Sequence, residues 1–371
     1  MIFPILSKEL MLIYFKYSYI TLTIVGNGEK QVFYQKEKTK RCHSFVPPDE
    51  VYINNIIQSE INDTYKFNES LNIVKLVWYN EINTTTCMFY RCNSIKYIDF
   101  SNFNSSLNSG DILGMFNGCK SLISLDLSNL NTSKVTSLEN IFFNCHALAK
   151  INLTNLDTSK ITCMSKMFFN CYALKSIDLS SFKTSELVNA NQMFENCYNL
   201  NSVDISNFNL TKVTNISLMF HNCESLKTVK FPNTETSNLE EISSLFMNCT
   251  SLVSLDLSNF ITSKVKIMDR LFYNCQSLTS INISNFDISN VIKIESIFEG
   301  CSNLQYINLQ NAKEINSSEY NYINAFTDIP ENLVICINET NAPELAKLIK
   351  GKNQSCYQIY CSDDWKSIQR K

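Results

Sequence analysis

The stretch MFFNCYALKSIDLSSFKTS, residues 167–185, decides the fold because its pattern returns along the chain at a constant interval. The cysteines that mark the pattern lie 26 residues apart, and they are Cys119, Cys145, Cys171, Cys197, Cys223, Cys249, Cys275 and Cys301. Cys92 precedes them by 27 residues, so the chain holds nine copies. A fixed period of this length is the signature of a repeat protein whose copies stack on one another.

A phenylalanine stands three positions before each of these cysteines. The column comprises Phe89, Phe116, Phe142, Phe168, Phe194, Phe220, Phe246, Phe272 and Phe298. Stacked repeats bring equivalent side chains into register, so we expect each ring to contact the ring above and the ring below. This column is the predicted centre of the core.

Composition narrows the function classes. The 371 residues are 44% hydrophobic and 18% charged, with a net charge of −3, which is enough apolar material for a large core. Lys and Arg are scattered without a basic stripe, so no footprint for nucleic acid is present. Glycine occurs only seven times, which argues against a phosphate-binding loop.

Within one copy, the apolar spacing predicts a helix of about ten residues followed by a short strand. Steps of three, three, one and three place these side chains on one helical face: Val135, Leu138, Ile141, Phe142 and Cys145. The position before each cysteine is Asn or Gly in eight copies, residues that tolerate the left-handed conformation closing a helix. Ile151 and Leu153 then alternate with polar residues, which predicts a half-buried strand.

The repeat also resembles known families. SLISLDLSNLNTSKV (121–135) resembles the leucine-rich repeat, and the pattern LDLSNF-TSKV---MF-NC-SL resembles the 26-residue repeat of bacterial surface proteins, the BspA-like group. The match covers about 87–312. The resemblance implies a cell-surface location and adhesion to host proteins. The expected fold class is α/β: a leucine-rich-repeat solenoid of about nine 26-residue strand–turn–helix repeats with N- and C-terminal caps.

Three regions are expected along the chain. Residues 1–85 form a β-rich N-terminal cap, with a hairpin at 18–35 turning at GNG (26–28); residues 86–315 form the solenoid; residues 316–371 form a C-terminal cap, with a strand, a turn and a helix in 329–352. The apolar start is interrupted by Lys8, Glu9 and Lys16. Two alternatives stay open there, a degenerate signal region or a protein made without a secretory signal.

The fifteen cysteines divide into two groups. The nine repeat cysteines are interpreted as small buried hydrophobic residues, since stacked parallel side chains place their Cβ atoms too far apart for disulfides. Cys336, Cys356 and Cys361 are candidates for a disulfide that staples the C-terminal cap. Cys87 and Cys92 have no histidine nearby that completes a zinc spacing, so no metal site is expected.

No catalytic or cofactor-binding residue stands out, so the expectation is that the chain is not an enzyme. There are three histidines, and His146 and His221 occupy columns that vary between copies and look like solvated surface positions. Catalysis needs groups that converge on one pocket, whereas a regular array spreads like residues along a line.

One polar column of the predicted strands is a candidate partner-binding strip. It comprises Asp126, Asn152, Asp178, Asp204, Asp256 and Asn282. Two interpretations stay open: a solvated sheet surface, or an acidic strip that docks a partner carrying cations. The thirteen Asn-x-Ser/Thr sequons, a slight excess over chance, leave Asn-linked glycosylation open as well.

These observations lead to a functional hypothesis with one alternative. We expect a cell-surface or extracellular recognition or adhesion protein that binds a protein partner (host, matrix or self) through the repeat ridge. The alternative is a cytoplasmic interaction scaffold that uses the same ridge. No nucleic acid and no small-molecule substrate is expected, and membrane association requires an anchor not seen in this chain.

Overall fold

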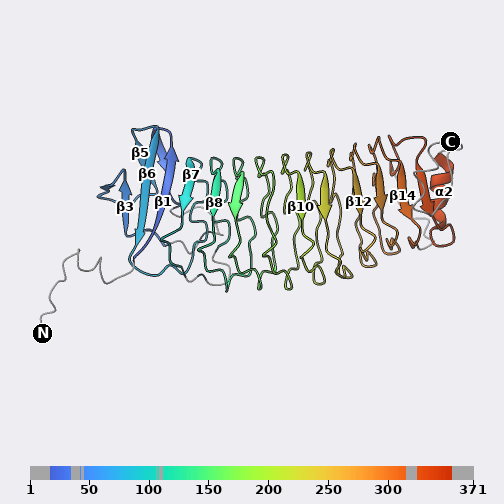
Figure 1. Ribbon diagram of the computed structural model, residues 1–371, viewed down its shortest axis with the longest axis horizontal. Helices are drawn as coiled ribbons and strands as arrows, with labels where there is room; N and C mark the ends of the chain where they lie inside the picture. Colours follow the sequence, from blue (N-terminus) through green and yellow to red (C-terminus); the bar gives the residue numbers. More distant parts are fainter. Residues whose placement is uncertain are drawn as a thin grey trace, which may run out of the picture.

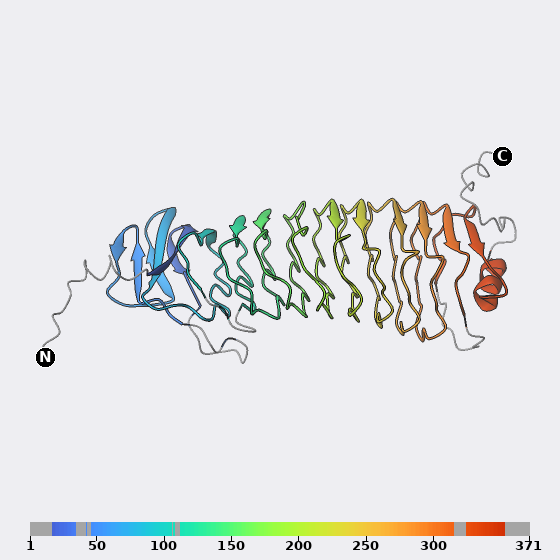
Figure 2. The same ribbon diagram turned by 60° about the horizontal axis from the view of Figure 1, so that its bottom comes forward.

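The computed structural model is a long ladder of coils with a cap at each end (Figures 1 and 2). The structure describes residues 17–34, 42, 46–105, 107, 112–314 and 324–352. The N-terminal cap lies at the blue end of the ladder, and helix α2 lies at the red end. Between them each 26-residue repeat makes one coil.

Short strands line one face of the coils. They are β7 (Ile95–Asp99), β8 (Ser124–Asp126), β9 (Lys150–Asn152), β10 (Ser202–Asp204), β11 (Thr228–Lys230), β12 (Ser254–Asp256), β13 (Ser280–Asn282) and β14 (Tyr306–Leu309). Paired strands run parallel and join equivalent positions of successive coils, as in Leu125 opposite Ile151. The predicted strand at Ile151 is therefore confirmed.

The predicted helix is wrong. In the segment 135–145 the chain makes successive tight turns, with Asn140 at φ 58° and Asn144 at φ 60°. The N–H of Phe142 donates to Met167 O at 3.1 Å, and the N–H of Asn144 donates to Phe169 O at 2.8 Å. These bonds reach the next coil instead of the carbonyl four residues back that a helix uses.

The fold class is consequently a β-solenoid of about nine coils, with almost no helix among the described residues, and the α/β strand–turn–helix solenoid is overturned. Turn bonds complete the pattern: the Ile141 N–H donates to Leu138 O at 3.3 Å, and the Cys145 N–H donates to Phe142 O at 3.1 Å. Each coil thus satisfies its backbone partly within a turn and partly through its neighbour.

The phenylalanine column fills the core as predicted. Neighbouring rings from Phe89 to Phe298 stack with centroids 5.3–5.9 Å apart and planes within 3–17° of parallel. Phe326 of the C-terminal cap continues the stack at 5.6 Å from Phe298. Every ring of the column is buried, so the stack is a continuous apolar axis of the solenoid.

The N-terminal cap extends the sheet of the first coils. Its strands are β1 (Ser18–Val25), β2 (Gly28–Gln31), β3 (Glu50–Ile53), β4 (Ile56–Ile57), β5 (Thr64–Phe67) and β6 (Leu71–Trp78). The sheet order β4-β3-β6-β1-β7-β8-β9 makes the cap and the first coils one surface. The antiparallel β1 therefore covers the open edge of β7.

The predicted hairpin at 18–35 is wrong in its pairing. Both strands exist on either side of Gly26 and Gly28, but β1 pairs with β6 and β7 whereas β2 pairs with β5. The physical reason is that both edges of β1 are occupied, so β2 has to find another partner.

At the other end, strand β15 (Val334–Ile337) pairs in parallel with β14. Helix α2 (Pro343–Lys352) follows it and packs Leu345, Ala346 and Ile349 into the core. This agrees with the strand, turn and helix predicted for 329–352. The last coil is thereby covered, as the end of a solenoid requires.

Candidate functional site

The candidate strip lies along the strand face of the solenoid. Its four aspartates are exposed, and its two asparagines, Asn152 and Asn282, are half-buried. Strand register pairs Asp126 with Asn152 and Asp256 with Asn282 in successive coils. Asp178 lies in a coil without a strand, so the 26-residue period and its equivalent turn place it in the column. The structure therefore brings the predicted residues into one column.

Each member of the strip also holds the turn that follows it. Its Oδ1 accepts the backbone N–H two residues later, at 2.9–3.2 Å, and the donors are Ser128, Thr154, Ser180, Ser206, Ser258 and Ser284. This is an Asx turn, which ends a strand by satisfying its last backbone donors. The column accordingly has a local structural role, whatever it binds.

The strip is not uniformly acidic. Lys230 occupies the same column and donates from Nζ to Asp204 Oδ2 at 2.9 Å. Hydrogen bonds from Ser206 and Lys230 lower the pKa of Asp204 to about 2. Asp126, Asp178 and Asp256 make no ion pair within the described ranges, so they are the members whose charge is available to a partner.

The same turns account for many of the sequons. The Oδ1 atoms of Asn131, Asn209, Asn215 and Asn338 also accept N–H groups two residues later, at 2.8–3.2 Å. The donors are the Ser or Thr residues of the sequons. Asn-x-Ser/Thr is thus the amide version of the Asp-x-Ser turn used elsewhere in the repeat, and the excess of sequons has a structural cause.

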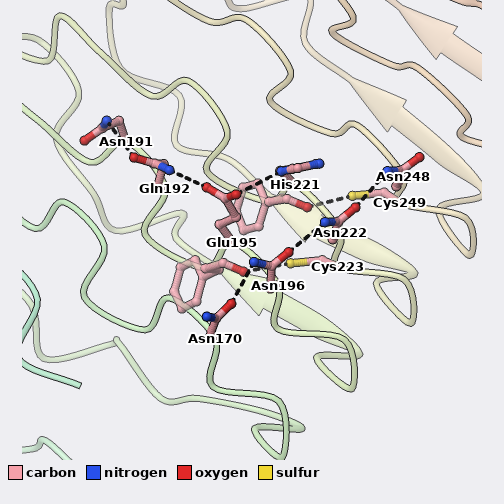
Figure 3. A network of polar contacts seen from close by, with 12 residues as sticks. Asn170, Asn191, Gln192, Glu195, Asn196, His221, Asn222, Cys223, Asn248 and Cys249 are labelled. Carbon is pink, nitrogen blue, oxygen red and sulfur yellow. Dashed lines mark hydrogen bonds and ion pairs between the residues drawn. The ribbon is translucent and has the colours of Figure 1, made fainter. Parts of the chain in front are cut away.

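A second column forms an asparagine ladder on the turn side of the coils (Figure 3). Each Nδ2 donates to the Oδ1 of the preceding coil at 2.6–2.9 Å, through Asn144, Asn170, Asn196, Asn222, Asn248 and Asn274. All six have positive φ, and Gly118 and Gly300 adopt positive φ in the flanking coils. The sequence predicted the left-handed backbone but not the side-chain ladder.

The repeat cysteines form no bridges. Cys92 and its eight successors are free and buried, and from Cys119 onward each Sγ donates to a phenylalanine carbonyl of the preceding coil at 3.1–3.3 Å. Burial raises the pKa of these thiols, that of Cys301 to about 12. A buried thiol with a raised pKa is inert, which agrees with their interpretation as structural residues.

Both repeat histidines differ from expectation. His146 is half-buried and stacks on Tyr172, with ring centroids 4.5 Å apart. His221 is half-buried, and its Nδ1 lies 3.1 Å from Oε1 of the buried Glu195 (Figure 3). Gln192 donates to Oε2 of the same carboxylate at 2.6 Å. The interpretation of His221 as a solvated surface residue is therefore wrong, because the preceding coil supplies its partner.

Disulfides occur at both ends of the chain. Cys42 and Cys87, 45 residues apart, are bonded, a pair that the sequence reasoning missed. Cys336 is disulfide-bonded, while Cys356 and Cys361 lie outside the described residues. The Cys42–Cys87 pair can be identified only from the fold, because the N-terminal cap brings the two residues together. Neither their spacing nor the composition of the sequence connects them.

Two features are absent from the described part of the chain. No cluster of three or more His, Cys, Asp or Glu side chains is arranged to hold a metal ion. Within the same residues, no helix has the length and apolarity needed to cross a membrane.

The repeats match a known protein family. A family described as "Mycoplasma protein of unknown function, DUF285" matches residues 57–151, 140–231 and 227–331, which together span most of the chain. No curated protein matches the sequence. The matched segments cover the coils of the solenoid together with strands β5 and β6 of the N-terminal cap, and the chain belongs to the DUF285 family.

Proposed function

We propose that this chain is a non-enzymatic recognition protein that binds a protein partner through the strand face of its coils. The observation that carries the proposal is the register of that face, which repeats the same polar column from one coil to the next. A repetitive surface suits contact with another macromolecule over several coils. Weak contacts made by several coils at once give a higher overall affinity than any one of them alone.

The charge of the strip indicates the kind of partner. Asp178 and Asp256 are exposed carboxylates without an ion pair in the described structure. A partner that presents Lys or Arg side chains at matching intervals complements them. Such an interaction is screened by salt, because it lies at the surface.

We further propose a cell-surface or secreted location, as the resemblance to BspA-like repeats implies. The disulfide between Cys42 and Cys87 and the bonded state of Cys336 support it, since stable disulfides are typical of oxidising compartments. The same bonds disfavour the cytoplasmic scaffold, in which thiols stay reduced.

The test measures attachment of beads coated with the full chain to a basement-membrane extract, at low and physiological salt. The variant carries Asp178→Asn and Asp256→Asn, because Asn keeps the acceptor of each turn and removes only the charge. We expect attachment to fall several-fold and to lose its salt dependence.

The matched control is Glu186→Gln, which removes a half-exposed charge that pairs with Lys212 away from the strip. Its attachment should equal that of the unmodified protein. If the unmodified chain and both variants attach equally, the strip is not the binding surface.

A further inference from the structure

The strand face of the solenoid has a hollow near the antiparallel N-terminal cap. It is an open depression of about 370 Å³ between β7, β8 and β9. Tyr97, Lys150, Asp126 and Asn152 surround it, and Ile98, Leu125 and Ile151 complete its lining.

Side-chain size explains why the hollow lies there. Register places Tyr97, Ser124 and Lys150 side by side in one row across three strands. The small Ser124 stands between two large side chains, which leaves space above it. In the next coils the same row contains Ser176, Ser202, Thr228, Ser254 and Ser280, so no such walls flank it. The row then reaches Tyr306 opposite Ser280, but that ring is buried.

The polar groups around the depression carry opposite charges. Lys150 is exposed and makes no ion pair in the described structure. Asn152 donates to Asp126 Oδ2 at 3.1 Å, and Ser128 N–H donates to Asp126 Oδ1 at 2.9 Å. Burial raises the pKa of Asp126, but these hydrogen bonds outweigh it and the pKa is lowered, so the group is a fixed carboxylate at neutral pH.

The remaining wall is aromatic. Tyr97 is 40% exposed, an unusual state for a large ring on a face built of small polar side chains. An aromatic ring offers an apolar surface and a hydroxyl that donates or accepts. The site therefore combines one apolar wall with a cation, an anion and an amide.

We propose that this depression binds one neutral pyranose unit of a glycan. A sugar hydroxyl donates to a carboxylate and accepts from an ammonium group, so it can use Asp126 and Lys150 together. The C–H face of the ring packs against Tyr97. A free cation is repelled by Lys150 and by Lys96, whose Nζ lies 5.6 Å from the centroid of the Tyr97 ring. A free anion is repelled by Asp126, so the site favours a neutral ligand.

The dimensions agree with a single sugar unit. A volume of about 370 Å³ lies at the small end of ligand sites, which span roughly 300–1,000 Å³. The depression opens onto the flat strand face, where the rest of an oligosaccharide has room to continue. The depression shares Asp126 and Asn152 with the candidate strip, but it lacks Asp178 and Asp256, whose charges are the ones tested for protein binding.

The experiment is saturation-transfer NMR of the full chain with three probes: lactose, cellobiose and di-N-acetylchitobiose. At least one probe should receive transfer at its ring C–H protons, with a Kd of about 1 mM. Tyr97→Ser and Asp126→Asn should each weaken binding about fivefold. Both substitutions are at exposed positions, and circular dichroism checks that the fold is intact.

The matched control is Asp256→Asn. Asp126 and Asp256 hold the same turn, each accepting the N–H two residues later at 2.9 Å, but only Asp126 borders the depression. Asp256→Asn should bind the sugar as the unmodified chain does. The proposal is overturned if no probe receives transfer at 10 mM, if Tyr97→Ser binds normally, or if both Asn variants lose binding equally.

Discussion

The central coils and the two ends cover their apolar side chains by different means. In the centre each coil takes its partners from neighbouring repeats of similar sequence. Phenylalanine rings stack, asparagine amides form hydrogen bonds with one another, and thiols donate hydrogen bonds to carbonyls of the preceding coil. At the ends this template stops, and an antiparallel sheet, a helix and disulfide-bonded cysteines replace it. A repeated column therefore stabilises only a coil that has neighbours.

The largest effect should come from breaking the central stack. Phe194 is fully buried between two rings, so Phe194→Ala should lower the free energy of unfolding by about 3–5 kcal/mol. The control Phe169→Ala removes a half-buried ring that stacks only at the turn edge, 4.7 Å from Phe143. It should cost about 1 kcal/mol, and equal costs in denaturant melts would refute the central role of the stack.

The next effect tests the ends. Replacing both Cys42 and Cys87 with Ser should destabilise the N-terminal cap by about 2–4 kcal/mol, because the unfolded chain regains the freedom of a 45-residue loop. In the centre, Cys197→Ala removes a free thiol and one weak hydrogen bond, so it should cost about 1 kcal/mol. Thermal melts with and without reductant measure both, and a chain indifferent to reductant contradicts the account of the caps.

A smaller effect separates backbone from side chain in the asparagine ladder. Asn222→Ala removes bonds to Asn196 and Asn248, both at 2.7 Å, and places Ala at φ 58°. We expect a loss of about 2–3 kcal/mol. Asn222→Gly loses the same bonds without the backbone strain, as at Gly118, so it should be about 1 kcal/mol more stable than the Ala variant. Equal stabilities would show that the left-handed backbone is not what the column selects.

The smallest effect concerns the surface. The pKa of Asp204 is lowered, so its contribution to stability is present above the ordinary aspartate pKa of about 3.9 and is lost as the pH falls toward about 2. Lys230→Ser removes one of the two partners and should raise the pKa of Asp204 while Ser206 keeps it below the ordinary value.

Carboxyl NMR titration measures this change. Lys212→Ser is the control, because Lys212 pairs with Glu186 and not with the strip. An unchanged pKa of Asp204 in the Lys230 variant would mean that neighbouring coils do not couple at the surface.

The sequence predicted the features that repeat. The 26-residue period, the contacts of the phenylalanine column and the left-handed Asn144 all follow from the columns. The strand at Ile151 was also predictable, since alternation of apolar and polar residues needs no knowledge of the neighbouring coil.

The helix was mispredicted because its apolar spacing also fits a series of turns. A helix and a series of turns differ in the carbonyl to which each backbone N–H donates. The sequence of a single repeat does not reveal that the N–H of Asn144 donates to a carbonyl of the next coil. The second left-handed position of each coil carries Asn140, Lys166, Gln192, Leu218 or other residues, so it left no signal in the sequence. Likewise, the partner of Cys42 and the wall at Tyr97 depend on how the cap meets the first coil.

The most direct test of the contrast between centre and ends is a thiol map of protein purified from its native source. Thiols are alkylated first in the native state, then after denaturation without reductant, and finally after reduction, and each step is read by peptide mass spectrometry. The account predicts that the nine repeat cysteines react only after denaturation, and that Cys42, Cys87 and Cys336 react only after reduction. Repeat cysteines that react in the native state, or end cysteines that react before reduction, would contradict it.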